Sequence, residues 1–146
     1  MQVEIKIDPS MTEPKIIVQT ASMTDELNDL LRRLSEPEPR FIAGFREGDA
    51  RLLDRSGILR IYASGGKVLA QTEEGEFSLR QRLYELEPRL RGESFVRISN
   101  SEIINLKKVR RFDLSIAGTI CVSLSDGSTS YVSRRYIPKI KSVLGL

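Results

Sequence analysis

Short segments that alternate apolar and polar residues occupy most of the chain between residues 41 and 132, with turn signals between them. A period of two is typical of strands that bury one face, and glycine or aspartate between such runs favours tight turns. The pattern predicts a mainly β (α+β) domain with a few short helices. The expected strands are residues 41–46, 50–53, 58–62, 67–72, a short one near 76–77, 95–98, 109–114, 119–124 and 129–132.

Two dipeptides predict hairpins within this domain. Gly65-Gly66 lies between two expected strands, and Asp126-Gly127 lies between two others. Glycine reaches the positive φ that two-residue hairpin turns require. Residues 103–106 are apolar but too short to be assigned as strand or helix from periodicity.

Two helices are expected beside these strands. The first has Ser78 as its expected cap, and Pro88 is expected to kink or end it. The second runs from Arg134 to Leu144 after Ser133, its expected cap. The leucines that define the first helix by their spacing are Leu79, Leu83, Leu86 and Leu90.

A pair of prolines separates an N-terminal extension from the main domain. Pro37 and Pro39 lie in a polar stretch, and prolines so placed end a helix and mark a boundary. The expected units are residues 1–36, the extension, and residues 40–146, the main domain.

The extension is expected to form two strands and a helix. Residues 3–7 alternate apolar and polar side chains, and residues 15–20 form a second strand-like run. Thr24 is placed to cap a helix with one leucine face. That face must be buried, either on the main domain or on a second subunit, so a homodimer is one of two expectations. The leucines are Leu27, Leu30, Leu31 and Leu34.

The composition disfavours enzymatic chemistry. The chain has no histidine and one cysteine, Cys121. Ser-His and Cys-His nucleophile pairs are therefore absent, and a zinc site is nearly excluded. We expect no catalytic residue, metal, cofactor or small-molecule substrate. A lone cysteine in an apolar strand, no apolar run of transmembrane length and no signal-peptide pattern favour the cytoplasm.

Charge is distributed unevenly along the chain. Residues 1–90 contain 13 Lys and Arg against 16 Asp and Glu, a net charge of −3, whereas residues 91–146 contain 10 against 4, a net charge of +6. A basic C-terminal part indicates a polyanionic partner such as nucleic acid. The alternative is an ordinary solvated surface.

Four motifs in order resemble the LytTR DNA-binding domain family. Residues 95–109, FVRISNSEIINLKKV, match the family pattern F-x-R-I/C-x-x-S-x-I/V-V/I-N-x-x-x-I/V, and residues 132–137, VSRRYI, are similar to its closing V-S-R-R-Y. Asp126-Gly127 falls at the family's glycine turn, and residues 82–87, RLYELE, resemble its L-x-E-L-E helix. The resemblance covers roughly residues 40–146.

The resemblance implies a fold and a function. The fold would be an elongated β-β-β sandwich, and its loops would enter successive major grooves of duplex DNA. The protein would be a bacterial transcription regulator of the standalone LytTR kind, without a receiver domain. It implies double-stranded DNA as partner, and a small membrane-protein inhibitor as a further one.

The resemblance also assigns the principal contact residues. Asn100 matches a base-contacting asparagine, whose amide suits the edge of adenine, with a backbone-bonding turn residue as the alternative. Arg135 matches an arginine that suits guanine or phosphate, and Arg134 suits phosphate. Lys67 follows Gly65-Gly66 in the hairpin where the family places a third contact, although the family often has histidine or a polar residue there.

The remaining candidates each have a structural alternative. Arg97 contacts phosphate or pairs with a carboxylate, and Ser99 and Ser101 are placed to donate to phosphate. Lys107 and Lys108 belong to a basic run that is a phosphate track or a solvated face. Asn105 and its apolar neighbours are expected to be structural.

Two other functions compete with duplex-DNA binding. A single-stranded nucleic-acid binder would need exposed aromatic residues for stacking, but aromatics make up only 6% of the chain. The other is a protein-interaction module that has lost DNA binding, which the presence of Asn100 and Arg135 disfavours.

Overall fold

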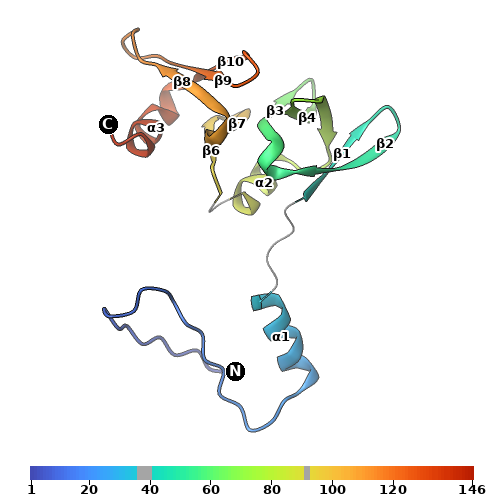
Figure 1. Ribbon diagram of the computed structural model, residues 1–146, viewed down its shortest axis with the longest axis vertical. Coiled ribbons are helices and arrows are strands. Elements are labelled where there is room, and N and C mark those ends of the chain that lie inside the picture. Colours follow the sequence, from blue (N-terminus) through green and yellow to red (C-terminus); the bar gives the residue numbers. More distant parts are fainter. Residues whose placement is uncertain (36–40, 91–92) are drawn as a thin grey trace. The chain divides into compact units, whose positions relative to one another are not determined.

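The computed structural model describes residues 1–35, 41–90 and 93–146, and the chain divides into two compact units, Met1–Glu38 and Pro39–Leu146 (Figure 1). The expected boundary at Pro37 and Pro39 lies outside the described residues. We call the two units the extension and the main unit, and each is described by itself.

The extension contains the expected helix but neither expected strand. Helix α1 spans Asp25–Ser35, and the Thr24 hydroxyl accepts a hydrogen bond from the Leu27 N–H at 3.1 Å, as expected of a cap. The strand predictions for residues 3–7 and 15–20 are wrong, because the structure has no strand before α1. A two-stranded hairpin without a third strand or a packed helix is marginal in water.

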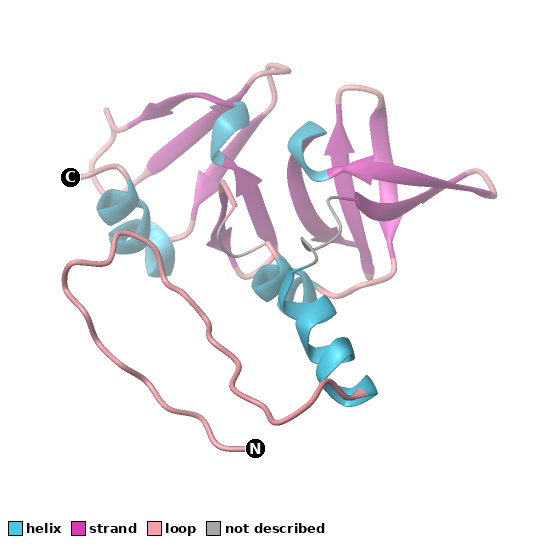
Figure 2. Cartoon of the chain, turned by 60° about the horizontal axis from the view of Figure 1, so that its bottom comes forward, coloured by secondary structure: helices cyan, strands magenta, loops and turns pink. Residues whose placement is uncertain are grey.

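The main unit contains a seven-stranded antiparallel sheet (Figure 2), which confirms the mainly β class. Its strands lie in the order β2-β1-β5-β4-β3-β7-β6. The short helix η1, Arg55–Gly57, joins β2 to β3. The strands are β1 Phe41–Arg46, β2 Asp49–Asp54, β3 Ile58–Ser64, β4 Lys67–Thr72, β5 Gly75–Leu79, β6 Phe95–Ser99 and β7 Glu102–Asn105.

A three-stranded sheet follows, in the order β10-β9-β8. Short helix η2, Leu106–Lys108, connects it to β7, and η3, Arg134–Tyr136, leads from it into α3, Ile137–Val143. The expected helix after Ser133 therefore begins as a 3₁₀ turn, and residues 103–106 divide between β7 and η2. The three strands are β8 Val109–Asp113, β9 Ile120–Leu124 and β10 Thr129–Val132.

Two apolar cores lie on opposite faces of the β3–β7 ladder. Ile58 and Ile61 of β3 enter the first core, which α2 (Leu83–Arg89) covers, while Leu59 enters the second, between the two sheets. This double burial explains the nearly continuous apolar run at the start of β3. The first core contains Ile42, Leu53, Ile58, Ile61, Val68, Ala70, Phe77, Leu79, Leu83, Leu86, Leu90 and Ile103. The second contains Leu59, Val96, Ile98, Ile104, Ile120, Val122, Leu124, Val132 and Ile140.

The predicted start of α2 is wrong by about one turn. Leu79 belongs to β5, where it pairs with Val68, and Ser78 donates to the Phe45 carbonyl oxygen at 3.1 Å instead of capping a helix. Leu79 satisfies the leucine spacing and also a period of two with Phe77, so the sequence fits both structures. The strand forms because it completes a ladder with β4. Pro88 lies in the last turn of α2.

Asn105 is a buried asparagine with a structural role, as expected. Its Nδ2 donates to the Ile58 carbonyl oxygen at 2.9 Å, and its Oδ1 accepts from the Ser94 hydroxyl at 2.7 Å and from the Lys107 N–H at 3.1 Å. The side chain thus caps η2 and ties β7 to β3. Removing it would leave buried polar groups without partners, which is costly.

We predict that Asn105→Ala lowers the free energy of unfolding by about 3 kcal/mol, from unpaired buried groups and a lost cap. Urea denaturation measures it. Asn100→Ala is the matched control, because Asn100 is exposed, and its cost should stay below about 1 kcal/mol. Equal losses in the two variants would contradict the structural role of Asn105.

Candidate functional site

The β6–β7 turn presents Asn100 to solvent. Ser99 pairs with Glu102 across the hairpin, so Asn100 and Ser101 form its tip. The Ser101 N–H donates to the Ser99 hydroxyl at 3.2 Å, and the two hydroxyl oxygens lie 3.3 Å apart. The two serines are therefore engaged with each other in the turn, while the side chain of Asn100 is exposed.

Arg97 fixes the backbone of this turn. Its Nε donates to the Ser99 carbonyl oxygen at 2.9 Å and its Nη2 to the Asn100 carbonyl oxygen at 2.5 Å. Its Nη1 donates to Glu87 of α2 at 2.8 Å, and the Arg97 side chain is only 14% exposed. This geometry favours the carboxylate-pairing alternative. Sequence reasoning missed Glu87 as the partner, because the pair joins separate elements.

The β3–β4 hairpin lies beside the same turn. The Ala63 N–H donates to the Ser101 carbonyl oxygen at 2.8 Å. One residue further along β3, Ser64 pairs with Lys67 across Gly65 and Gly66, whose φ values are 58° and 77°. Two residues with positive φ form the turn that matches strand twist. The hairpin therefore places the exposed Lys67 at the same end of the sheet as Asn100.

The start of the C-terminal helix flanks the turn through β6. The Ser133 N–H donates to the Ile98 carbonyl oxygen at 2.9 Å, and the Tyr136 hydroxyl donates to Asn100 Oδ1 at 3.3 Å. Arg134 and Arg135 are exposed on η3 between these two contacts. Sequence reasoning missed the part of Tyr136, although its place in the VSRRYI motif was a signal.

The exposed amide of the turn is therefore surrounded by cationic groups, and the described carboxylates do not neutralise these cations. In the described part of the chain, no ion pair engages Lys67, Arg134 or Arg135; the Arg135 guanidinium lies 6.0 Å from the centroid of the Tyr136 ring. Exposed guanidinium and ammonium groups around an amide suit an anionic ligand that also offers donors and acceptors.

Lys107 and Lys108 lie at the other end of the β6–β7 hairpin. Phe95 pairs with Asn105, and η2 follows directly, so these lysines are separated from Asn100 by the length of β7. Four residues at about 3.3 Å each give about 13 Å. The structure therefore does not bring these lysines together with Asn100 and Arg135.

A polar network that sequence reasoning missed joins the two sheets. Arg60 of β3 donates to Gln71 at 2.7 Å and to Ser130 of β10 at 3.0 Å, and it pairs with Glu102 at 3.4 Å. Its neighbour Tyr62 donates to Glu76, and burial followed by this hydrogen bond raises the pKa of Tyr62 to about 12. The one signal was an arginine inside an apolar strand. The network holds β10, and so η3, against β3.

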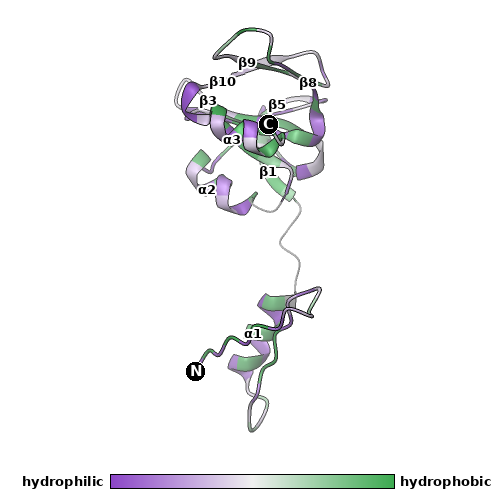
Figure 3. Cartoon of the chain, turned by 90° about the vertical axis from the view of Figure 1, so that its left-hand side faces the viewer, coloured by the Kyte–Doolittle hydropathy of each residue, from purple (hydrophilic) through white to green (hydrophobic). Residues whose placement is uncertain are grey.

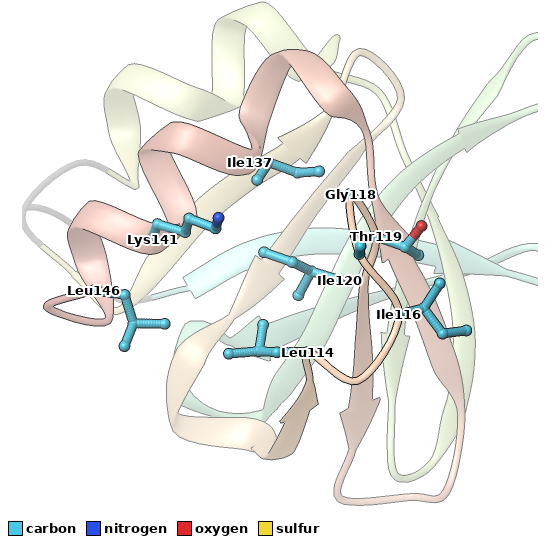
Figure 4. A pocket seen from close by; sticks show the side chains of 9 residues that line it. Leu114, Ile116, Gly118, Thr119, Ile120, Ile137, Lys141 and Leu146 are labelled. Carbon is cyan, nitrogen blue, oxygen red and sulfur yellow. The ribbon is translucent and has the colours of Figure 1, made fainter.

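An apolar hollow lies apart from these residues, between the β8–β9 loop and α3 (Figure 4). Lys141 is the one charged side chain among the described residues that line it, and Ile116 and Ile137 are among the apolar ones. A small-molecule site normally adds several convergent polar groups to apolar walls. The hollow therefore gives no support to a substrate site.

The chain is similar to a known domain family, to bacterial regulators and to a solved domain. The sequence model of the LytTr DNA-binding domain family matches residues 49–145. Uncharacterized HTH-type transcriptional regulators of Staphylococcus aureus strains NCTC 8325 and MRSA252 are 29% and 28% identical over 147 residues, covering 100% of this chain and 99% of each relative. A solved LytTr DNA-binding domain from Bacillus cereus has a TM-score of 0.71 at 21% identity, over 74% of this chain and 99% of that one, and shows the fold.

The fold of this chain differs from what the relatives' names suggest. In the described residues, five strands separate α1 from α2 and five more separate α2 from α3. A helix-turn-helix requires two helices joined by a turn of a few residues, so the described part of the chain has none. No helix in that part is long and apolar enough to cross a membrane.

We predict that Arg97→Lys loosens the turn, because one ammonium cannot replace the fork of bonds to Ser99, Asn100 and Glu87. Hydrogen exchange followed by NMR should show the Ala63 amide exchanging about ten-fold faster, the equivalent of one lost hydrogen bond. Arg111→Lys is the control, because Arg111 is exposed and, among the residues that the structure describes, forms an ion pair only with nearby Asp113, at 3.3 Å. Unchanged Ala63 exchange in Arg97→Lys would refute the positioning role.

Proposed function

The chain belongs to the LytTR DNA-binding domain family, and from that premise we propose that it regulates transcription by binding specific sequences of duplex DNA through the Asn100 turn and its two neighbours. The family is one of DNA-binding domains and not of enzymes. One observation carries the proposal: three elements far apart in the sequence are hydrogen-bonded into one exposed, cationic end of the main unit.

The three elements divide the work of binding. Phosphate contacts provide affinity and orientation, and contacts to base edges provide specificity. Arg134 and Lys67 flank the turn and neutralise phosphates, while Asn100 and Arg135 enter the major groove. An asparagine amide pairs with adenine, and a guanidinium pairs with guanine. Ser99 and Ser101 shape the turn and donate to phosphate.

Tyr136 orients the Asn100 amide for this contact. Because its hydroxyl donates to Oδ1, the Asn100 amide is held with Nδ2 free to donate to a base. Oδ1 keeps a second lone pair, so it can accept from the base at the same time. Arg97 has a separate role, which is to fix the backbone from which the Asn100 amide projects.

The cellular setting follows from the same premise. A regulator that contacts promoter DNA acts in the cytoplasm of a bacterium. We include in the proposal a small membrane protein as an inhibitory partner that would hold the regulator away from DNA. Co-purification of a membrane protein with the full chain, and its loss on addition of duplex DNA, would support this part of the proposal.

We predict that the chain binds random-sequence duplex more tightly than single strands, with an affinity that falls steeply with salt. Arg134→Gln should reduce the slope of log affinity against log salt by about 0.9, the value for one phosphate contact. Fluorescence anisotropy at several salt concentrations measures it. The matched control is Lys107→Gln, at the far end of β7, which should leave the slope unchanged.

Two results would contradict this prediction. Absence of duplex binding at low salt would refute the proposed function. Equal slopes for the chain and Arg134→Gln, with a reduced slope for Lys107→Gln, would move the phosphate contacts to η2.

We predict that Asn100→Ala and Arg135→Ala affect specificity more than general affinity. On a site recovered by selection from a random duplex pool, each should weaken binding by about 1–3 kcal/mol, whereas Asn100→Ala should leave binding to unselected duplex nearly unchanged. Repeating the selection with each variant should show relaxed preference at one base position. If selection with both variants recovers the original site with the same base preference at every position, the proposed base contacts are wrong.

A further inference from the structure

The extension exposes apolar residues in a strand-like pattern (Figure 3). Val3, Ile5 and Ile7 are 83%, 83% and 89% exposed, and Ile16 and Ile17 are 70% and 69% exposed. Large apolar side chains so exposed within two short segments indicate an interaction site. The extension therefore needs a partner surface.

The charge of the extension disfavours DNA as that partner. Residues 1–35 contain four Lys and Arg and six Asp and Glu, a net charge of −2. A surface that binds DNA phosphates carries a net positive charge. The partner surface therefore has to offer apolar side chains together with charges of both signs.

The leucine face of α1 is complementary to a second copy of itself. Its four leucines lie symmetrically about the point between Leu30 and Leu31. Two antiparallel copies of α1 related by a two-fold axis would place Leu27 opposite Leu34 and Leu30 opposite Leu31. Leu34 is 51% exposed, so it is accessible for such a contact. An isologous interface of this kind closes as a dimer.

One pair of charges on α1 obeys the same symmetry. Asp29 and Arg32 lie equally far from the point between Leu30 and Leu31, whereas Asp25, Glu26 and Arg33 have no oppositely charged counterpart there. The antiparallel arrangement that pairs the leucines also places Asp29 of one copy opposite Arg32 of the other. It also sets the two helix dipoles antiparallel and side by side, which adds to the attraction.

We propose that residues 1–35 form the interface of a homodimer, in which antiparallel α1 helices pack leucine to leucine and residues 3–7 and 15–18 pair as strands between copies. An 11-residue helix is about 16 Å long, too little for an interface of about 1,600 Å², so the extended segments must contribute. The inference rests on the proposed function in one respect: the dimer brings two DNA-binding units together.

Charge exchange between copies tests the pairing directly. Sedimentation equilibrium of the full chain without DNA should show a dimer. Asp29→Lys and Arg32→Glu should each raise the dimer dissociation constant about ten-fold, because each creates two like-charge contacts across the two-fold axis. An equimolar mixture of the two variants should restore the affinity of the unaltered chain, because every contact in the heterodimer is then attractive.

The mixture controls for effects within one helix. Asp29 and Arg32 also form an intrachain ion pair at 2.8 Å, which both variants break and mixing does not restore. A monomeric chain at all concentrations, or variants that do not recover on mixing, would overturn the inference.

Duplex binding distinguishes this failure from failure of the proposed function. A monomer that still binds duplex with the predicted salt dependence would overturn only the dimer. A dimer with the expected charge exchange but no duplex binding would overturn only the proposed function.

Discussion

The antiparallel ladder of β3 and β7, buried on both faces, is the constraint on which the rest of the main unit depends. Ile61 and Ile103 enter one core, and Leu59 and Ile104 enter the other. A one-residue slip in register would turn every side chain of the strand to the opposite face of the sheet. Apolar groups would then point into the wrong core. The register is therefore fixed, and with it the contact between Ala63 and Ser101 that brings the β3–β4 hairpin to the Asn100 turn.

Polar contacts complete what the ladder begins. Arg97 fixes the backbone of the turn from below, Tyr136 contacts its amide from η3, and Arg60 holds β10 against β3. Each of these side chains is at least partly withdrawn from solvent and bonded to protein. The exposed cations and the exposed amide are the groups left for a ligand, which separates the residues that build the site from the residues that we propose to contact DNA.

The sequence predicted those features that depend on local chemistry. Gly65-Gly66 and Asp126-Gly127 located two hairpins, Thr24 located the start of α1, and the linked motifs located Asn100 and Arg135. It failed where one pattern suits two structures, as at Leu79, and where a strand needs a partner, as at residues 3–7. The role of Arg97 and the network of Arg60 depend on residues distant in sequence, such as Glu87 and Ser130, so spacing alone could not reveal them.

Mapping of duplex binding by NMR tests most directly whether one end of the main unit contacts DNA. Titration with duplex should shift backbone amide signals in three segments: Ser64–Lys67, Ser99–Ser101 and Arg134–Tyr136. The signals of Lys107 and Lys108, at the far end of β7, should move little. Shifts centred on η2 or on α2, with the Asn100 turn unaffected, would contradict the assignment of the DNA-binding surface.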